Sequence, residues 1–231
     1  MTAFLKAVGL GVDIVEFDVR ETLDGELVIL HDPTLDRTTN GSGPVNAKTW
    51  DEIRALNATY YVGPREGGAR HAEAQGDEGI PLFADVLASL AGRVGLNIQV
   101  YAERPDSLKK IVNLYLEYGL KDSAFLMLPT FSEAARIRET HSEVAICVGE
   151  NREDLERHMA FGVDFLQPRK SQLTDDYLRK IQASGIPFNV FYANSQADMR
   201  WLIDRDARGI MTDRPDCLLR TLEALSALAN E

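Results

Sequence analysis

Short apolar runs rich in β-branched residues alternate along the chain with longer segments whose apolar residues recur every three or four positions. The first pattern is typical of strands and the second of amphipathic helices. We predict strands near residues 12–18, 27–30, 94–100, 124–128, 145–148, 165–166, 187–192 and 209–211. Helices are expected over residues 107–118, 132–139, 153–161, 174–184, 197–205 and 215–229. This alternation indicates a parallel α/β architecture in which the helices cover a sheet.

Two acidic residues stand two positions apart on the first of these strands. Side chains two apart on an extended strand project from the same face, so Glu16 and Asp18 share one small space while their apolar neighbours pack on the other face. Repulsion between the two carboxylates is unfavourable in a core unless a proton or a cation lies between them. Oxygen ligands of this kind suit hard ions such as Ca²⁺ or Mg²⁺.

A histidine ends the next apolar run, over residues 27–30. His31 could transfer protons near neutral pH, and a metal ion beside it would suggest hydrolysis. Each residue also has a plainer interpretation. An isolated Glu-x-Asp is common on solvated edge strands, and His31 could cap its strand or bond Asp32, itself a turn-former before Pro33.

The segment after the histidine favours the functional interpretation. Residues 34–43 read Thr-Leu-Asp-Arg-Thr-Thr-Asn-Gly-Ser-Gly and follow directly on His31-Asp32-Pro33. With Glu16-Phe17-Asp18 and the turn Leu23-Asp24-Gly25, this order resembles the glycerophosphodiester phosphodiesterases. Members of that family carry a Glu-x-Asp strand, a Lys-Asp-Gly or similar turn, a strand ending in His-Asp, and a Thr-Leu-x-Arg-Thr-Thr-x-Gly-x-Gly run.

Looser likeness to the same family continues toward the end of the chain. Residues 80–87 resemble its Ile-Pro-x-Leu-x-x-x-Leu motif, and residues 96–100 resemble a later strand. Residues 189–194 stand where the family usually has Trp-Thr-x-Asn, and residues 209–215 resemble its last strand and turn. The resemblance therefore covers nearly the whole sequence.

The resemblance implies a triosephosphate-isomerase-type (β/α) barrel, whose active site gathers at the C-terminal ends of the strands. We therefore expect Glu16, Asp18 and His31 late in their strands. Residues 1–8 resemble the helix that follows the family's first strand, so the barrel is expected to lack that strand and its His-Arg pair. Residues 33–80 are expected to form a small insertion or loop region after the second recognisable strand.

Composition and charge limit the other possibilities. A chain of 231 residues that is 45% hydrophobic can bury one substantial core, so we expect a single domain over 1–231. Its net charge of -11 argues against binding to nucleic acid or anionic membranes. No apolar run approaches the roughly 20 residues that span a bilayer, so no stable membrane anchor is expected. The two cysteines, Cys147 and Cys217, favour a reducing compartment, and we expect a cytoplasmic protein.

The family resemblance also implies roles for individual residues. Glu16 and Asp18 would ligate a divalent metal ion, Ca²⁺ or Mg²⁺, and His31 would be catalytic. The sequence departs from the family at Gln99 and Tyr101, which stand at the usual Glu and Lys of a later strand. Gln99 is expected to offer its amide oxygen to the metal, and Tyr101 a hydrogen bond to substrate phosphate. Phe191 replaces the family's tryptophan and is expected either to wall the substrate or to belong to the core.

Three functions remain open from the sequence. The leading hypothesis is metal-dependent hydrolysis of small-molecule glycerophosphodiesters to glycerol phosphate and an alcohol, with activity reduced or altered. The second is a catalytically inactive barrel that binds phosphate esters or a protein partner, because Gln99 and Tyr101 remove a carboxylate and an ammonium group. The third is another phosphodiester cleavage on the same scaffold.

Overall fold

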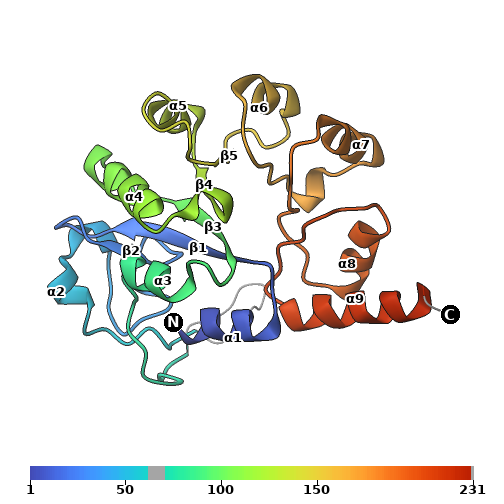
Figure 1. The fold of residues 1–231 in the computed structure, drawn as a ribbon. Coiled ribbons are helices and arrows are strands. Elements are labelled where there is room, and N and C mark those ends of the chain that lie inside the picture. Colours follow the sequence, from blue (N-terminus) through green and yellow to red (C-terminus); the bar gives the residue numbers. More distant parts are fainter. Residues whose placement is uncertain (62–70, 230–231) are drawn as a thin grey trace. The chain divides into compact units, whose positions relative to one another are not determined.

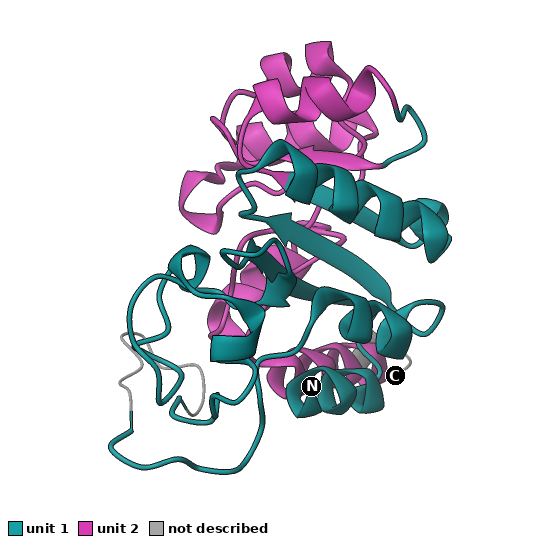
Figure 2. Cartoon of the chain, turned by 90° about the vertical axis from the view of Figure 1, so that its left-hand side faces the viewer, with its two compact units in different colours: residues 1–127, 141–144 teal, residues 128–140, 145–231 magenta. Residues whose placement is uncertain are grey.

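The computed structural model describes residues 1–61 and 71–229 of the chain. Figure 2 shows two compact units, one of residues 1–127 and 141–144 and the other of residues 128–140 and 145–231. The part of the expected insertion at residues 62–70 lies outside the described residues. A single domain over 1–231 remains a prediction.

The strands of the described residues form a five-stranded mixed sheet in the order β2-β1-β3-β4-β5. They are β1 (Ile14–Glu21), β2 (Leu27–Ile29), β3 (Gly95–Val100), β4 (Ala124–Leu128) and β5 (Ile146–Val148). β1 pairs in parallel with β3, which pairs in parallel with β4. The α/β class is confirmed, and closure of the strands into a barrel remains a prediction.

The strand β2 departs from the expected parallel series, because it pairs antiparallel with β1. The two strands are joined by residues 22–26, a connection too short for the crossover that parallel neighbours need. The Thr22 N–H donates to the Glu26 carbonyl (2.9 Å), and Gly25 adopts a φ of 84° that favours glycine. β1 and β2 therefore form a hairpin.

One face of β1 packs against helices. Figure 1 shows α1 (Thr2–Leu10) and α3 (Phe83–Leu90) on the same side of β1. The Phe17 ring lies 5.6 Å from the Phe4 ring and 6.1 Å from the Phe83 ring. The helix α4 (Pro105–Glu117) is tied to β4, because the Tyr115 hydroxyl donates to the Ala124 carbonyl at 2.8 Å. This packing leaves the other face of β1 for the polar residues.

The segment after β2 folds around an apolar cluster of its own. It contains the 3₁₀ turn Val45–Ala47 and the short helix α2 (Trp50–Ile53), which begins with a capping box between Thr49 and Glu52. Six buried side chains form the cluster: Val28, Leu30, Leu35, Val45, Ile53 and Ile80. The described part of residues 33–80 is therefore a packed region attached to β2.

The second unit is mostly helical. It contains α5 (Phe131–Arg138), α6 (Leu155–Phe161), α7 (Asp175–Ser184), α8 (Gln196–Ile203), α9 (Pro215–Ala229) and the 3₁₀ turn Lys170–Gln172, and the first unit contains the 3₁₀ turn Leu120–Asp122. The helix patterns read from the sequence are confirmed. None of the helices in the described part of the chain is both long and apolar enough to cross a bilayer.

Three expected strands of this unit are wrong as regular strands. Residues 165–166, 187–192 and 209–211 form isolated parallel bridges instead, which pair Leu166 with Phe188 and Val190 with Ile210. Pro168 follows the first of these segments closely and Pro187 begins the second, and a proline has no N–H to donate to a ladder. The segments are extended and hydrogen-bonded, but their ladders are too short to be strands.

The packing of Phe17 generates a stability prediction. Phe17→Ala removes a ring that is only 2% exposed, and we expect it to lower the free energy of unfolding by about 3–5 kcal/mol. Urea unfolding measures this loss. Leu23→Ala is the matched control, because Leu23 is 54% exposed and its truncation is expected to cost less than about 0.5 kcal/mol. Equal losses in the two variants would contradict the packing described.

Candidate active site

The polar face of the paired strands β1 and β3 carries most of the candidate residues. Glu16 lies opposite Asn97, and Asp18 lies opposite Gln99, in parallel register. Because side chains alternate along a strand, these four residues point to one face. Asp18 and Gln99 are buried, at 8% and 9% exposure. The sequence therefore places Glu16 and Asp18 on one face correctly, but both lie within β1 rather than at its end.

The hairpin brings Leu30 back opposite Asp18, so that His31 follows directly beside it. The Leu30 N–H donates to the Asp18 carbonyl at 3.1 Å, which continues the pairing of β2 with β1 by one residue. Arg20 then holds the His31 carbonyl with two donors, Nε at 2.9 Å and Nη2 at 2.6 Å. His31 follows β2 rather than ending it, and its position next to Asp18 comes from the antiparallel return of the chain.

The imidazole of His31 is oriented by a chain of charged residues. Its Nδ1 lies 2.7 Å from Oδ1 of Asp32, so the Asp32 carboxylate accepts from Nδ1–H and Nε2 is the ring nitrogen with a lone pair. Arg37 makes a bidentate ion pair with Asp32, in which Nε donates to Oδ2 at 2.6 Å and Nη2 donates to Oδ1 at 2.7 Å. These bonds hold the pKa of Asp32 down at about 2. The Arg37 guanidinium also lies over the Tyr61 ring, 4.6 Å from its centroid.

The ionised form of Asp18 is disfavoured by burial. Burial raises its pKa to about 6, although the charges of His31 and Arg20 favour its ionised form. Burial also lowers the pKa of the Arg20 guanidinium and raises that of the Tyr101 hydroxyl. The centre of this face is therefore dry enough for charges to interact strongly.

The two residues that depart from the family pattern contact each other. The Gln99 side-chain amide donates to the Tyr101 hydroxyl. The Tyr101 ring lies under the Arg20 guanidinium, 4.4 Å from its centroid. Gln99, Tyr101 and Arg20 thus form one contiguous group beside Asp18.

The oxygen atoms on this face are of the kind that a hard cation binds. Among the described residues, no group of three His, Cys, Asp or Glu side chains is arranged to hold a metal ion. The face nevertheless offers the carboxylates of Glu16 and Asp18 and the amide of Gln99. The Asn97 side chain, opposite Glu16, is buried with neither amide atom paired inside the described structure. Two carboxylates and amide oxygens fit Ca²⁺ or Mg²⁺ in chemistry, with less charge than three carboxylates supply.

The structure groups five of the six expected site residues in the first unit: Glu16, Asp18, His31, Gln99 and Tyr101. Phe191 belongs to the second unit, where its half-buried ring lies 4.9 Å from the Arg152 guanidinium and 5.1 Å from the Tyr192 ring. Sequence reasoning missed Arg20 and Arg37. Arg20 stands two positions after Asp18 on the same strand, so strand alternation could have placed it on the same face. Arg37 lies inside the motif at residues 34–43, which could have marked it as a candidate.

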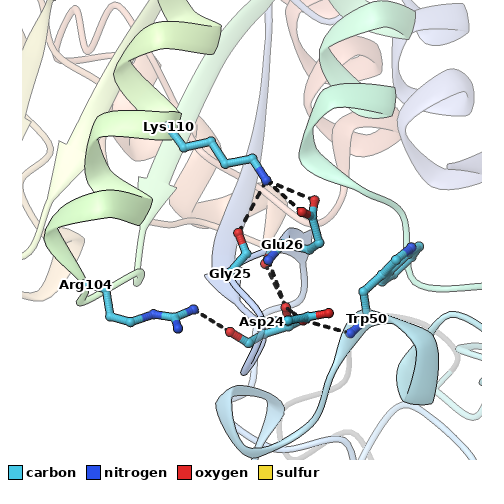
Figure 3. Close-up of polar contacts among 7 residues, drawn as sticks. Asp24, Gly25, Glu26, Trp50, Arg104 and Lys110 are labelled. Atoms are coloured by element: carbon cyan, nitrogen blue, oxygen red, sulfur yellow. Dashed lines mark hydrogen bonds and ion pairs between the residues drawn. The ribbon is translucent and has the colours of Figure 1, made fainter.

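Side chains from elsewhere in the first unit fix the turn of the hairpin. Figure 3 shows Lys110, from α4, reaching the Gly25 carbonyl and both carboxylate oxygens of Glu26, the latter at 3.0 Å. Asp24 accepts from the Trp50 N–H at 3.0 Å. The Arg104 guanidinium donates to the carbonyls of residues 22 and 23. The turn is therefore held to α2 and α4, which fixes the register that brings His31 to Asp18.

The Asp32–Arg37 pair generates a pH-dependent prediction. Because the folded-state pKa of Asp32 is depressed, the pair stabilises the fold above about pH 4 and loses its contribution as pH falls toward 2. We expect Asp32→Asn to cost about 1 kcal/mol at pH 7, allowing for solvent screening, and progressively less between pH 4 and pH 2. Urea unfolding at pH 7, 5, 4 and 3 measures the difference.

The exposed Asp77 provides the control, since Asp77→Asn alters a carboxylate for which no ion pair is present in the described structure. It is expected to match the parent chain at every pH. A cost for Asp32→Asn that stayed constant down to pH 3 would contradict the assigned pair.

Comparison with known proteins shows the family to which the chain belongs. A model of the glycerophosphoryl diester phosphodiesterase family matches residues 1–217. The chain is 26% identical over 226 residues to a glycerophosphodiester phosphodiesterase of Caldanaerobacter subterraneus subsp. tengcongensis, covering 95% of this chain and 89% of that protein. It is 28% identical over 228 residues to the uncharacterized protein YqiK of Bacillus subtilis, covering 94% of this chain and 89% of the other.

Solved structures share the fold. A putative glycerophosphoryl diester phosphodiesterase from Silicibacter pomeroyi superposes with a TM-score of 0.81 at 17% identity, covering 96% of this chain and 87% of that one. An Oleispira antarctica phosphodiesterase, solved with its product sn-glycerol-3-phosphate, gives 0.79 at 20% identity, covering 96% and 89%. The family match runs through both units and includes the β1–β2 hairpin and His31. This chain therefore belongs to the glycerophosphoryl diester phosphodiesterase family of enzymes.

Proposed function

We propose that this chain hydrolyses glycerophosphodiesters, releasing a glycerol phosphate and an alcohol, with the help of a divalent cation. The observation that carries the proposal is the position of His31. Its imidazole is oriented by Asp32, the hairpin register pairs the preceding Leu30 with Asp18, and the charge of His31 acts on the Asp18 carboxylate, on a face rich in oxygen donors. A histidine next to a cation-binding face is the arrangement that metal-assisted phosphodiester hydrolysis requires.

In this proposal, Glu16 and Asp18 hold the cation, with the amide oxygen of Gln99 as a further ligand. Ca²⁺ and Mg²⁺ suit these oxygen donors. A cation bound there neutralises and orients the phosphodiester. The buried Asp18 carboxylate supports the assignment, because its ionised form needs a positive partner in this dry surrounding.

His31 moves the proton. Its side chain is 71% exposed, so the attacking water molecule can approach Nε2. Nε2 takes the proton of the attacking oxygen as that oxygen bonds to phosphorus, and the bond to the leaving alkoxide breaks. A proton returned from Nε2 converts the alkoxide into the alcohol. Asp32 holds Nδ1–H throughout, which keeps the correct tautomer.

Two further residues of the expected set, Tyr101 and Phe191, have proposed roles. The Tyr101 hydroxyl lies on the same face as Asp18 and would donate a hydrogen bond to a phosphate oxygen. For Phe191, in the second unit, both expected roles stay open in the proposal, an apolar wall for a substrate or a place in the core. The Oleispira relative was solved with sn-glycerol-3-phosphate, which supports a small glycerol phosphate as the product released here.

The finer features of the fold and location follow from the same family membership. We propose that the strands and bridges of the chain belong to a triosephosphate-isomerase-type barrel. We also propose that the protein acts in the cytoplasm. Both cysteines are free, and burial raises the pKa of the Cys147 thiol to about 12, so that thiol is inert.

One observation favours a second function, the binding of phosphate esters without turnover. Gln99 and Tyr101 bond to each other, and neither carries the charge of a carboxylate or an ammonium group. A site with fewer charged groups stabilises the charge of a phosphoryl-transfer transition state less than a more highly charged site does. Binding of a glycerophosphodiester that is recovered intact would support this function over the first.

The role of His31 generates an activity prediction. We expect His31→Ala to lower the rate of hydrolysis by about 10²- to 10⁴-fold, because a general acid–base group contributes that much. Release of glycerol phosphate from a panel of glycerophosphodiesters measures the rate. The matched control is His141→Ala, which alters a partly exposed histidine paired with Glu143 and should leave the rate unchanged. Equal rates for the parent chain and His31→Ala would exclude the assigned role.

The cation assignment generates a second prediction for the same assay. Treatment with a chelator should abolish turnover, and Ca²⁺ or Mg²⁺ should restore it. Asp18→Asn removes one of two anionic ligands and is expected to raise the cation concentration needed for half-maximal activity at least about tenfold. Asp77→Asn serves as the control with no expected change. Full activity in the presence of the chelator would refute the assignment.

A further inference from the structure

We propose that Arg20 binds the phosphate group of the substrate and supplies the positive charge that Tyr101 does not. The inference rests on the proposed hydrolysis and names a phosphate-binding residue for that same site. Arg20 is a phosphate-binding residue in this inference, while His31 remains the group that moves the proton.

The first argument is the position of Arg20. It stands two residues after Asp18 on β1, so its side chain leaves the strand on the same face as Glu16 and Asp18. The Tyr101 N–H donates to the Val19 carbonyl at 2.9 Å, which brings Tyr101 alongside this part of β1. The Arg20 guanidinium then lies over the Tyr101 ring at 4.4 Å. The positive charge is thus located directly above Tyr101.

The second argument is that the guanidinium is fixed and yet retains a donor. Nε and Nη2 both donate to the His31 carbonyl, and the Tyr101 ring supports the guanidinium plane. In the described part of the chain, no hydrogen-bond partner is present for Nη1. A rigid guanidinium with an available N–H is suited to bind a phosphate oxygen, because little side-chain entropy remains to be lost.

The third argument is charge balance. β1 and β3 contribute Glu16 and Asp18 to this face, and a phosphodiester adds another negative charge. Arg20 is the basic residue that these two strands provide. The nearby Arg37 is already engaged by both carboxylate oxygens of Asp32. Because Arg20 is half-buried, water screens its attraction to an anion less than at the surface.

The competing interpretation is purely structural, since Arg20 also holds the His31 carbonyl. The two roles require different things of the side chain. Holding a carbonyl needs N–H donors, whereas binding phosphate needs a positive charge at this place. A charge restored from another residue would rescue phosphate binding but would not replace the bonds to the His31 carbonyl.

The first experiment compares Arg20→Gln with the parent chain. Glycerol 3-phosphate binding is measured by calorimetry, and glycerophosphodiester hydrolysis is followed in parallel. We expect the dissociation constant and KM to rise about 10- to 100-fold, the range for losing a charge-assisted hydrogen bond. Arg93→Gln is the matched control, because Arg93 also donates to a backbone carbonyl, that of Ser89 at 2.9 Å, and precedes β3. Its binding should be unchanged.

The second experiment adds Tyr101→Lys to Arg20→Gln. If Arg20 provides the charge, the double variant should regain at least about tenfold in glycerol 3-phosphate affinity over Arg20→Gln. Arg20→Lys should likewise bind better than Arg20→Gln. If Arg20→Gln fails to fold, two single variants replace it, Arg20→Lys and Tyr101→Lys. Tyr101→Lys keeps Arg20 and adds a second positive charge, so it is expected to bind glycerol 3-phosphate more tightly than Arg20→Lys.

The two proposals fail in different ways. Hydrolysis in the parent chain with unchanged binding in Arg20→Gln would overturn the role of Arg20 and leave the proposed function standing. Binding that depends on Arg20 in a chain that hydrolyses nothing would keep the role of Arg20 and overturn the proposed hydrolysis. Loss of binding in Arg20→Gln with no recovery from either lysine variant would assign Arg20 to holding His31 alone.

Discussion

The register of the β1–β2 hairpin is the constraint on which the candidate site depends. A shift of one residue would turn every side chain of β2 to the other face and would move His31 away from Asp18. The register is fixed at the turn by Lys110 and Arg104, and at the other end by the bonds from Arg20 to the His31 carbonyl. The chemistry at one end of the hairpin therefore depends on packing at the other.

The packing of the apolar face of β1 explains why the buried Asp18 carboxylate lies beside β3. The apolar face of β1, centred on Phe17, packs on α1 and α3, so the opposite face must take Asp18 whatever its cost. That cost is visible in the raised pKa of Asp18. Arg20 and His31 offset part of it, and a bound cation would offset more. Ionisable groups with pKa values shifted in this way cluster at functional sites.

Several features of the site were readable from the sequence because they depend on neighbours along the chain. Alternation on a strand was enough to put Glu16 and Asp18 on one face, and the run at residues 34–43 identified the family. The antiparallel direction of β2 was not read, although its five-residue turn at 22–26 excludes a parallel crossover. The extended segments around Pro168 and Pro187 were assigned as strands, since local preference does not reveal whether a ladder has enough donors.

The sequence alone determined the α/β class, the acidic pair on β1, the proton-transferring candidate and the two substitutions at Gln99 and Tyr101, because each is a matter of residue type and local spacing. Only the tertiary structure decided which of these residues meet. The distance between Arg20 and Tyr101, the grip of Arg37 on Asp32 and the return of His31 to Asp18 arise from strand register and side-chain packing. Those contacts join residues separated along the chain, and pairings of that kind are set by the whole core rather than by any one segment.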